Sequence, residues 1–417
     1  MASSSGRSAP VYILFAQPDG SATSTRVDVS DRIKSLSYED VEKGPDKLTL
    51  KVRNEDYSGF ANPIFADGTT LVFSYGYADG VMSPPRTAII TKVTGGAELT
   101  VEARGQACLL NLLPKIRTFK QMKRSDVAHQ IATEQGYDAA HTFIEDTSIV
   151  LPQISQAKMT DAMLLRDMAK KEGAEFFIDY RGFHFHKRDL GQAPRRLYTY
   201  FTDPGQGDIL TPPHVENDIF HKPGQVTAKG IDPKTGKPFA ITADNSSDPG
   251  RQGLGYSVQI DKASLQRGQR TQKLGSDATL ASTAKSAGDA KRQVEAAYRK
   301  VQLTAAKVTF TAIGDPLMEA KTLITLAGAV GVLAGNYYVT KVKGDLGSDF
   351  KQVLECRRDT LGRATGVKST ASVNGQAATT GSAGDTTLDR KVVVDPRTQQ
   401  TRTVFVPKGS PPTPGQK

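Results

Sequence analysis

The chain has 417 residues, of which 38% are hydrophobic and 24% charged, so it can bury two or three separate cores. Its longest apolar stretch, residues 323–334, is shorter than the roughly 18 residues that a membrane-spanning helix needs, and residues 1–10 lack the apolar segment of a signal peptide. We therefore expect a globular protein without a membrane span, made in the cytoplasm.

Charge and cysteine content narrow the function classes further. The formal net charge of +10 favours acidic partners, but the basic residues are spread along the whole chain and no Trp accompanies them. Sequence-specific nucleic-acid binding is therefore not indicated. The two cysteines, Cys108 and Cys356, are far apart and form no CxxC motif, so neither a disulfide framework nor a zinc site is predicted.

Residues 11–112, which follow a flexible N-terminus at 1–10, have the pattern of a first antiparallel β-barrel. In residues 47–53 the apolar side chains alternate with polar ones, as in a strand with one buried face. Turn residues separate the segments at the short spacing typical of barrels and sandwiches. The predicted strands are 11–15, 26–29, 33–38, 47–52, 68–77, 87–93 and 98–103.

Residues 113–197 change to a mixed pattern that predicts a small α/β module. Ser125 can cap a helix that runs through Gln135 and ends at Gly136. Thr160 can cap a second helix that ends at Gly173, and residues 175–187 follow as a hairpin.

Residues 198–362 return to β patterns and predict a second barrel. It includes a helix at about 288–301 and a long exposed loop at about 243–283, where apolar residues are scarce. Residues 363–417 are rich in Gly, Ser, Thr and Ala, and predict a flexible extension with a possible hairpin at 391–406. The predicted strands of the second barrel are 198–202, 225–230, 306–312, 323–326, 337–342 and 350–357.

Two stretches of the chain resemble each other. Residues 70–72, 89–93 and 99–104 match residues 322–324, 338–342 and 352–357 in order and spacing, and both copies contain Thr-Lys-Val. A chance match of β patterns is the alternative. A true repeat would mean two copies of one small barrel, and three such chains would place six similar barrels in a ring. A threefold object could then stack on a sixfold one.

The same residues resemble a known family, the late control protein D or tail hub family of contractile phages, which includes the N-terminal hub part of VgrG-type spikes. The resemblance covers residues 10–362. It rests on Ser37-Tyr38-Glu39-Asp40, Gly44-Pro45-Asp46-Lys47-Leu48-Thr49-Leu50, Tyr75-Gly76-Tyr77, residues 160–173 with Glu175-Phe176-Phe177, and Gly314-Asp315-Pro316 through Gly335-Asn336-Tyr337-Tyr338-Val339.

The resemblance implies a mainly β (α+β) fold with two similar tube-like antiparallel β-barrel domains and an inserted α/β module. It also implies a homotrimeric baseplate hub in a virion tail or equivalent injection particle, assembled in the bacterial host cytoplasm. The implied partners are the hexameric tail tube protein, the trimeric central spike protein, the C-terminus of the tape-measure protein and baseplate wedge proteins. DNA or effector would pass through the channel without sequence-specific binding.

The chain also departs from relatives of this family. No lysozyme-like domain and no long C-terminal β-helix repeat are recognisable, so we expect no enzyme activity and a separate spike chain. The alternative is a tail-associated cell-wall hydrolase or peptidase with glycan-binding β domains. The hairpin near 392–406 is a candidate for strand addition to a neighbouring spike or tube subunit.

Possible chemical sites are few. His184 and His186 lie on one strand face, but no third metal ligand is near, so solvent-facing or interface histidines are favoured over a metal site. Neighbouring carboxylates, Glu39 with Asp40 and Glu55 with Asp56, should point to opposite faces or to water. The glycines of 328–335 fit turns or bulges in a bent strand. We predict no catalytic, cofactor-binding or metal-binding residue.

Overall fold

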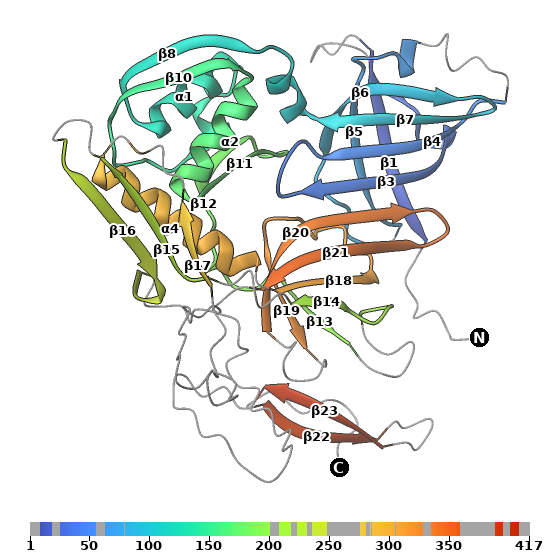
Figure 1. Ribbon diagram of the computed structural model, residues 1–417. Coiled ribbons are helices and arrows are strands. Elements are labelled where there is room, and N and C mark those ends of the chain that lie inside the picture. Colours follow the sequence, from blue (N-terminus) through green and yellow to red (C-terminus); the bar gives the residue numbers. More distant parts are fainter. Residues whose placement is uncertain are drawn as a thin grey trace.

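Figure 1 shows the computed structural model of the chain. It describes residues 9–18, 26–55, 63–78, 80–200, 208–217, 223–231, 236–247, 276–280, 284, 286–304, 306–327, 335–358, 388–394 and 401–407. Most of the predicted N-terminal segment, of the 243–283 loop and of the 363–417 extension lies outside these residues. The predicted mainly β, α+β fold class is confirmed. No helix within the described ranges is long and apolar enough to cross a membrane.

The first β region contains seven antiparallel strands, in the order β3-β4-β7-β6-β5-β1-β2. They are β1 (Pro10–Gln17), β2 (Val27–Asp28), β3 (Ile33–Val41), β4 (Lys47–Arg53), β5 (Thr70–Tyr77), β6 (Arg86–Gly95) and β7 (Glu98–Gly105). Short 3-10 turns lie at Ser30–Arg32, Pro63–Phe65 and Gln106–Asn111. The alternation in β4 works as expected, because Leu48, Leu50 and Val52 are buried in the core that this sheet wraps.

The second β region repeats this arrangement, in the order β14-β18-β21-β20-β19-β13. Its strands are β13 (Arg196–Thr199), β14 (His214–Asn217), β18 (Ala306–Ile313), β19 (Leu323–Ala327), β20 (Gly335–Leu346) and β21 (Phe350–Arg358). Tyr198, Phe310, Tyr337 and Leu354 are buried in its core. One difference is that β13 runs parallel to β19, whereas β1 is antiparallel to β5.

The two β regions are joined edge to edge. Lys341–Leu346, the second half of β20, pairs antiparallel with β3, so the strands form one 13-stranded sheet. Figure 1 shows this seam where the orange β20 lies beside the blue β3. The sequence predicts two barrels with a module between them in the chain, but it does not predict this direct pairing.

A β-bulge marks the same position in both copies. In β6 the register against β7 shifts between Ile90 and Lys92, and in β20 the register against β21 shifts between Val339 and Lys341. The extra residue is Thr91 in one copy and Thr340 in the other. Each threonine hydroxyl donates to the glutamate carbonyl across the pair, Glu102 at 3.3 Å and Glu355 at 2.9 Å. The shared Thr-Lys-Val is thus a structural repeat of one bulge.

Strand pairing extends the repeat beyond the sequence match. Residues 47–50 of β4 (Lys-Leu-Thr-Leu) pair with β7 as residues 307–310 of β18 (Lys-Val-Thr-Phe) pair with β21. Strands β3 and β14 then occupy equivalent places beside β4 and β18, with Glu39 opposite Lys47 and Glu216 opposite Lys307. Five strands, rather than three, therefore correspond.

One part of the sequence match was out of register by a residue. Ile90 N donates to Thr69 O and Val339 N donates to Thr322 O, so Thr69, rather than Thr70, is equivalent to Thr322. Because Thr69 and Thr70 are adjacent, the sequence alone allowed either of them to be aligned with Thr322. The preceding positions agree with the corrected alignment, because Gly68 and Lys321 both have positive φ, 87° and 65°.

The α/β module holds its own core and lies beside the first β region (Figure 1). Its elements are β8 (Lys115–Met122), α1 (Arg124–Glu134), a 3-10 turn (Ala139–His141), β9 (Thr142–Ile144), β10 (Leu151–Met159), α2 (Asp161–Glu172), β11 (Ala174–Ile178) and β12 (Phe183–Lys187). Thr160 caps α2 and Gly173 ends it at φ 68°, as predicted. Ser125 does not cap α1; it is buried and bonds Asp146, while Lys123 holds the cap position.

Residues 223–304 contain a further unit with its own sheet, which the sequence had placed in the second barrel. It contains β15 (Pro223–Ile231), β16 (Pro238–Asp244), a 3-10 turn (Asn245–Ser247), β17 (Ser276–Leu280) and α4 (Ala287–Thr304). The apolar face of α4 covers this sheet, with Val294 and Tyr298 in a separate core, and the helix packs on α2. Residues 276–280, expected in a loop, pair parallel with β15 because Ala278 and Leu280 alternate with polar residues.

A hairpin lies near the C-terminus. Strand β22 (Leu388–Val394) pairs antiparallel with β23 (Thr401–Pro407), at the place where the sequence predicts a hairpin.

Candidate functional site

One face of the joined sheet packs on the hydrophobic cores, and the other face is polar. Eight consecutive strands, from β14 to β6, each place at least one charged side chain on the polar face, and one from each strand forms a row in which the signs alternate from strand to strand. This charge row consists, in strand order, of Glu216, Lys307, Glu355, Lys341, Glu39, Lys47, Glu102 and Lys92. The two sequence copies contribute four equivalent residues each.

Ion pairs connect the row along the sheet. Across the seam, Lys341 Nζ lies 3.3 Å from Glu39 Oε1 and 3.4 Å from Glu355 Oε1. Lys47 Nζ lies 3.0 Å from Glu102 Oε2, and Lys307 Nζ lies 2.8 Å from Glu216 Oε2. Because these side chains are partly or fully exposed, each pair contributes about 0–1 kcal/mol to stability. The row therefore determines the surface potential more than it stabilises the fold.

Three members of the row, Glu102, Glu216 and Lys341, have a pKa shifted in the direction that favours the charged form. A hydrogen bond from Lys47 lowers the pKa of Glu102, and the charge of Lys92 acts in the same direction. A hydrogen bond from Lys307 lowers the pKa of Glu216. Partial burial alone would lower the pKa of Lys341, but Glu39 and Glu355 raise it. At these three positions the opposite charges of the row thus stabilise each other.

A buried polar junction lies behind the seam. Lys321 Nζ is 2.6 Å from Asp40 Oδ1, and Ala320 N donates to the other oxygen at 3.0 Å. Lys321 also donates to the carbonyl of Val41 at 2.9 Å. These residues come from opposite ends of the chain, so their bonds attach the second β region to β3.

Tyr38 and Arg86 extend this junction into the first β region. The Tyr38 hydroxyl donates to Asp46 Oδ2 at 2.6 Å, and Arg86 Nη1 donates to Tyr38 at 3.2 Å. Arg86 Nη2 lies 3.0 Å from Glu319, which also binds Arg195 at 2.9 Å. Burial, together with the charge of Asp40, raises the pKa of Asp46 to about 6. Buried charges of this kind orient their neighbours, because an unpaired partner would be costly.

Two more ion-pair groups attach the α/β module. Arg188 contacts Glu42 of the first β region and Glu175 of β11, and the Tyr338 hydroxyl donates to Glu175 at 2.6 Å. The two β regions and the α/β module meet there. In the other group, Arg124 of α1 binds Glu172 of α2 at 2.5 Å and Asp289 of α4 at 2.9 Å.

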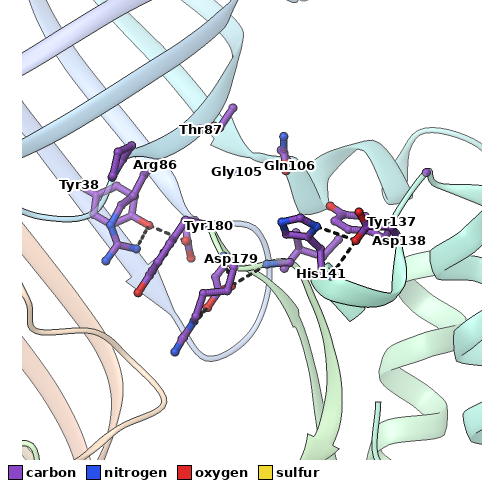
Figure 2. Close-up of a pocket in the computed structure, with 16 residues that line it drawn as sticks. Tyr38, Arg86, Thr87, Gly105, Gln106, Tyr137, Asp138, His141, Asp179 and Tyr180 are labelled. Atoms are coloured by element: carbon purple, nitrogen blue, oxygen red, sulfur yellow. Dashed lines mark hydrogen bonds and ion pairs between the residues drawn. The ribbon is translucent and has the colours of Figure 1, made fainter. Parts of the chain in front are cut away.

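A polar cavity of about 320 Å³ lies between the first β region and the module. Figure 2 shows Tyr38 and Arg86 on one side and Tyr180, Asp179 and His141 on the other. The guanidinium carbon of Arg86 lies 5.3 Å from the Tyr180 ring centroid.

The carboxylates of this cavity already have partners. Tyr38 binds Asp46, and His141 Nδ1 lies 2.7 Å from Asp138 Oδ1. Burial would raise the pKa of Asp179, but hydrogen bonds from His184 and Arg181 lower it. The cavity therefore has the chemistry of a packed boundary between the first β region and the module.

The predicted histidines differ from each other. His184 is buried, stacks on Phe177 at 4.4 Å between ring centroids, and lies 3.0 Å from Asp179 Oδ1. The solvent-facing interpretation is therefore wrong for His184, because the aromatic rings of the module enclose it. His186 lies 5.5 Å from it, ring to ring, and bonds the Lys187 carbonyl. Among the described residues no group of three or more ligand side chains could hold a metal ion.

The structure also gives the positions of most of the carboxylates and cysteines considered in the sequence analysis. Glu39 and Asp40 point to opposite faces, as predicted, but Asp40 is buried at the junction rather than in water. Glu55 is exposed, while Asp56 and residues 328–334 lie outside the described residues. Cys356 is buried and Cys108 half-buried, and both are free thiols. Lys321, Arg86 and Glu319 were missed, because their partners are more than 200 residues away in the chain.

Two solved structures with the same overall fold are tail proteins. The tail protein from Neisseria meningitidis MC58 has a TM-score of 0.60 and 12% identity, over 84% of this chain and 98% of that chain. The 43 kDa tail protein of prophage MuSo2 from Shewanella oneidensis has a TM-score of 0.60 and 12% identity, over 85% and 100%. The common fold thus extends over nearly all of each tail protein.

Comparison with curated proteins gives no match. Among protein families, the one described as the Alg8 N-terminal domain matches residues 58–347, which include β5 to β20 and the whole α/β module. Because this match covers more than half of the sequence, the chain belongs to the Alg8 N-terminal domain family.

Proposed function

We propose that this chain is a structural, non-enzymatic hub in the tail baseplate of a contractile injection machine. Three copies form a pseudo-sixfold ring that adapts a hexameric tail tube to a trimeric central spike and encloses the delivery channel. The observation that carries this proposal is the five-strand repeat, with its equivalent bulges at Thr91 and Thr340, inside one continuous sheet. The fold that the chain has in common with two tail proteins supports it.

The buried junction fits a mechanical role. A ring that imitates sixfold symmetry needs its two repeats at a constant angle within each chain. The Lys321–Asp40 and Arg86–Glu319 pairs, together with the β3–β20 seam, hold the repeats in that way. Because removal of one partner leaves a buried charge, the junction resists partial opening.

The polar face suits the wall of a channel. Within the charge row the signs alternate from strand to strand, so the row offers a passing polyanion no continuous line of positive charge. DNA held by many phosphate contacts would leave slowly at low salt. We therefore propose that DNA or effector passes along this face without sequence-specific binding.

Several partners follow from this role. The tube protein and the spike would stack on opposite ends of the ring, the C-terminus of the tape-measure protein would enter the channel, and baseplate wedge proteins would contact the outside. The β22–β23 hairpin would add to a strand of a neighbouring spike or tube subunit. The machine would be assembled in the cytoplasm of the bacterial host and act in the finished particle.

Mass measurement tests the hub proposal. Light scattering of the full chain at micromolar concentration should give three times the monomer mass of 44.8 kDa. Obligate interfaces of about 2,000 Å² or more would keep the trimer together on dilution. A monomer that stays monomeric when mixed with the tube and spike proteins of its particle would contradict the proposal.

A further inference from the structure

One edge of strand β6 lacks a partner strand in the described residues, although the equivalent edge of β20 has one. In β20, residues 335–338 pair with β19 and residues 341–346 pair with β3. In β6, residues 86–89 pair with β5, but residues 92–95 pair only with β7 within the described part of the chain. Backbone groups along this edge of β6 are therefore available to another strand.

The complementary edge is at the other end of the sheet. Strand β14 is equivalent to β3 and pairs on one side with β18, as β3 pairs with β4. The other side of β3 is taken by β20, whereas β14 is the last strand of the sheet in the described residues. In the described residues, one chain thus has two unpaired strand edges, one on β6 and one on β14. The equivalent edges of β20 and β3 are paired with each other.

Exposure of the side chains agrees with a missing neighbour at β6. At the seam, Lys341 is 30% exposed and Val342 is buried. Their equivalents in the first copy, Lys92 and Val93, are exposed and half-buried. The same positions are thus covered in one copy and open in the other.

We propose that β6 of one chain pairs antiparallel with β14 of a second copy, and that three such junctions close the ring. The register follows from the seam, where Lys343 pairs with Glu39 and Gly344 with Tyr38. Applied to the equivalent residues, it places Thr94 opposite Glu216 and Gly95 opposite Val215 of the next subunit. This inference rests on the trimeric hub proposed above and specifies how its subunits join.

The charge row supports the same pairing independently of the backbone. The row begins with Glu216 on β14 and ends with Lys92 on β6, so joining these edges continues the alternation without two like charges side by side. Lys92 would meet Glu216 as Lys341 meets Glu39 at 3.3 Å. Lys92 has no ion pair with a described residue of its own chain, so its charge is available for the neighbour. Opposite charges across a strand pair also select one register.

Disulfide trapping tests this junction. In a Cys108→Ser background, the full chain carries Thr94→Cys together with Glu216→Cys and is oxidised with copper phenanthroline. Directly opposite residues of an antiparallel pair come within disulfide reach, so most of the protein should run as a covalent trimer on a non-reducing gel. Each single variant should remain monomeric on that gel.

A register control keeps the test specific. Thr94→Cys with His214→Cys places the thiols two residues apart along the same face, beyond ordinary disulfide reach, so crosslinking should fall about tenfold or more. A trimer by light scattering that gives no 94–216 disulfide would overturn this junction and leave the hub proposal in place. A protein that is monomeric in the same measurement would overturn both. Equal crosslinking in the control and test pairs would overturn the proposed register.

Discussion

Charged residues at the seam fall into two classes that differ in burial. Lys321 and Asp40 are 10% and 5% exposed, whereas Lys341 and Glu39 are 30% and 28% exposed. A buried ion pair costs more free energy when one partner is lost, because the remaining charge is left without water or a counter-ion. We therefore assign the stability of the seam to the buried pair and the surface pattern to the exposed one.

Replacing each lysine with methionine tests this distinction. Lys321→Met should lower the free energy of unfolding by about 3–5 kcal/mol, because Asp40 is left unpaired in the interior. Lys341→Met should change it by about 1 kcal/mol or less. Urea unfolding at neutral pH measures both values. Equal losses in the two variants would contradict the assignment.

Asp46 gives the junction a pH dependence. Its pKa in the folded protein is about 6, above the ordinary aspartate pKa of 3.8, so the folded state binds the proton more tightly than the unfolded state. The contribution of Asp46 to stability is therefore most favourable below the unfolded pKa and is lost as pH rises through about 6.

Asp46→Asn imitates the protonated group at every pH. The variant should be more stable than the wild type above pH 7, by on the order of 2 kcal/mol, and the difference should vanish below about pH 4. Melting temperatures of the two proteins across this range provide the measurement. A difference that does not depend on pH would show that Asp46 titrates normally.

At the residue scale, the sequence predicted on which face of a strand some side chains lie, but not which side chains hold the fold together. Opposite faces for Glu39 and Asp40 followed from strand periodicity alone. The partner of Asp40 is Lys321, 281 positions away, and no local pattern relates the two. His184 looked solvent-facing because the strand alternation did not show that Phe177 and Phe143 would cover it.

Among elements, those with clear periodicity or caps were predicted well. β4 alternates cleanly, and α2 has both a Thr160 cap and a Gly173 stop. β8 was missed because its pattern is weak: Phe119 is buried while Ile116 is largely exposed. It was harder to predict which sheet each strand joins. Strands β15 to β17 have ordinary strand patterns, and only tertiary pairing separates them from the second β region.

The two helix-ending glycines provide a matched pair. Gly173 and Gly136 have φ values of 68° and 84°, so Gly→Ala strains the backbone in both. Only at Gly173 would the new Cβ meet another element, since Ala296 Cβ of α4 would lie 3.1 Å away. Nothing lies within 4 Å of the corresponding atom at Gly136.

Gly136→Ala should therefore cost about 1 kcal/mol of stability, and Gly173→Ala about 1 kcal/mol more. Chemical unfolding of both variants measures the difference, which reports the packing of α2 on α4. If Gly136→Ala costs as much as Gly173→Ala, this contact is not tight in solution.

For the whole molecule, duplication explains both the strand junction that one chain makes by itself, between β3 and β20, and the two strand edges that it leaves unpaired, on β6 and β14. The sequence revealed three strands of the repeat, and hydrogen bonding extended it to five. Short matches such as Lys-Leu-Thr-Leu and Lys-Val-Thr-Phe are too common to be recognised before their partners are known. One junction between repeats is made within the chain, and we infer that the equivalent junction is made between chains.

Charge reversal at the open edge should weaken the trimer. Lys92→Glu would place a carboxylate beside Glu102 and beside Glu216 of the next subunit, so the trimer should dissociate at roughly tenfold or higher concentration. Lys51→Glu makes the same charge change on the same face of β4, away from either open edge, and should have little effect on assembly. Sedimentation velocity over a dilution series distinguishes them, and equal weakening would show that net charge alone is responsible.

Electron cryo-microscopy of the assembled full chain tests the central claim most directly. We predict a closed ring with threefold symmetry, six similar β lobes and a continuous sheet in which β6 of each subunit pairs with β14 of the next. Subunits joined through other surfaces, or an arrangement in which the two β regions of each chain do not alternate around one axis, would contradict the account.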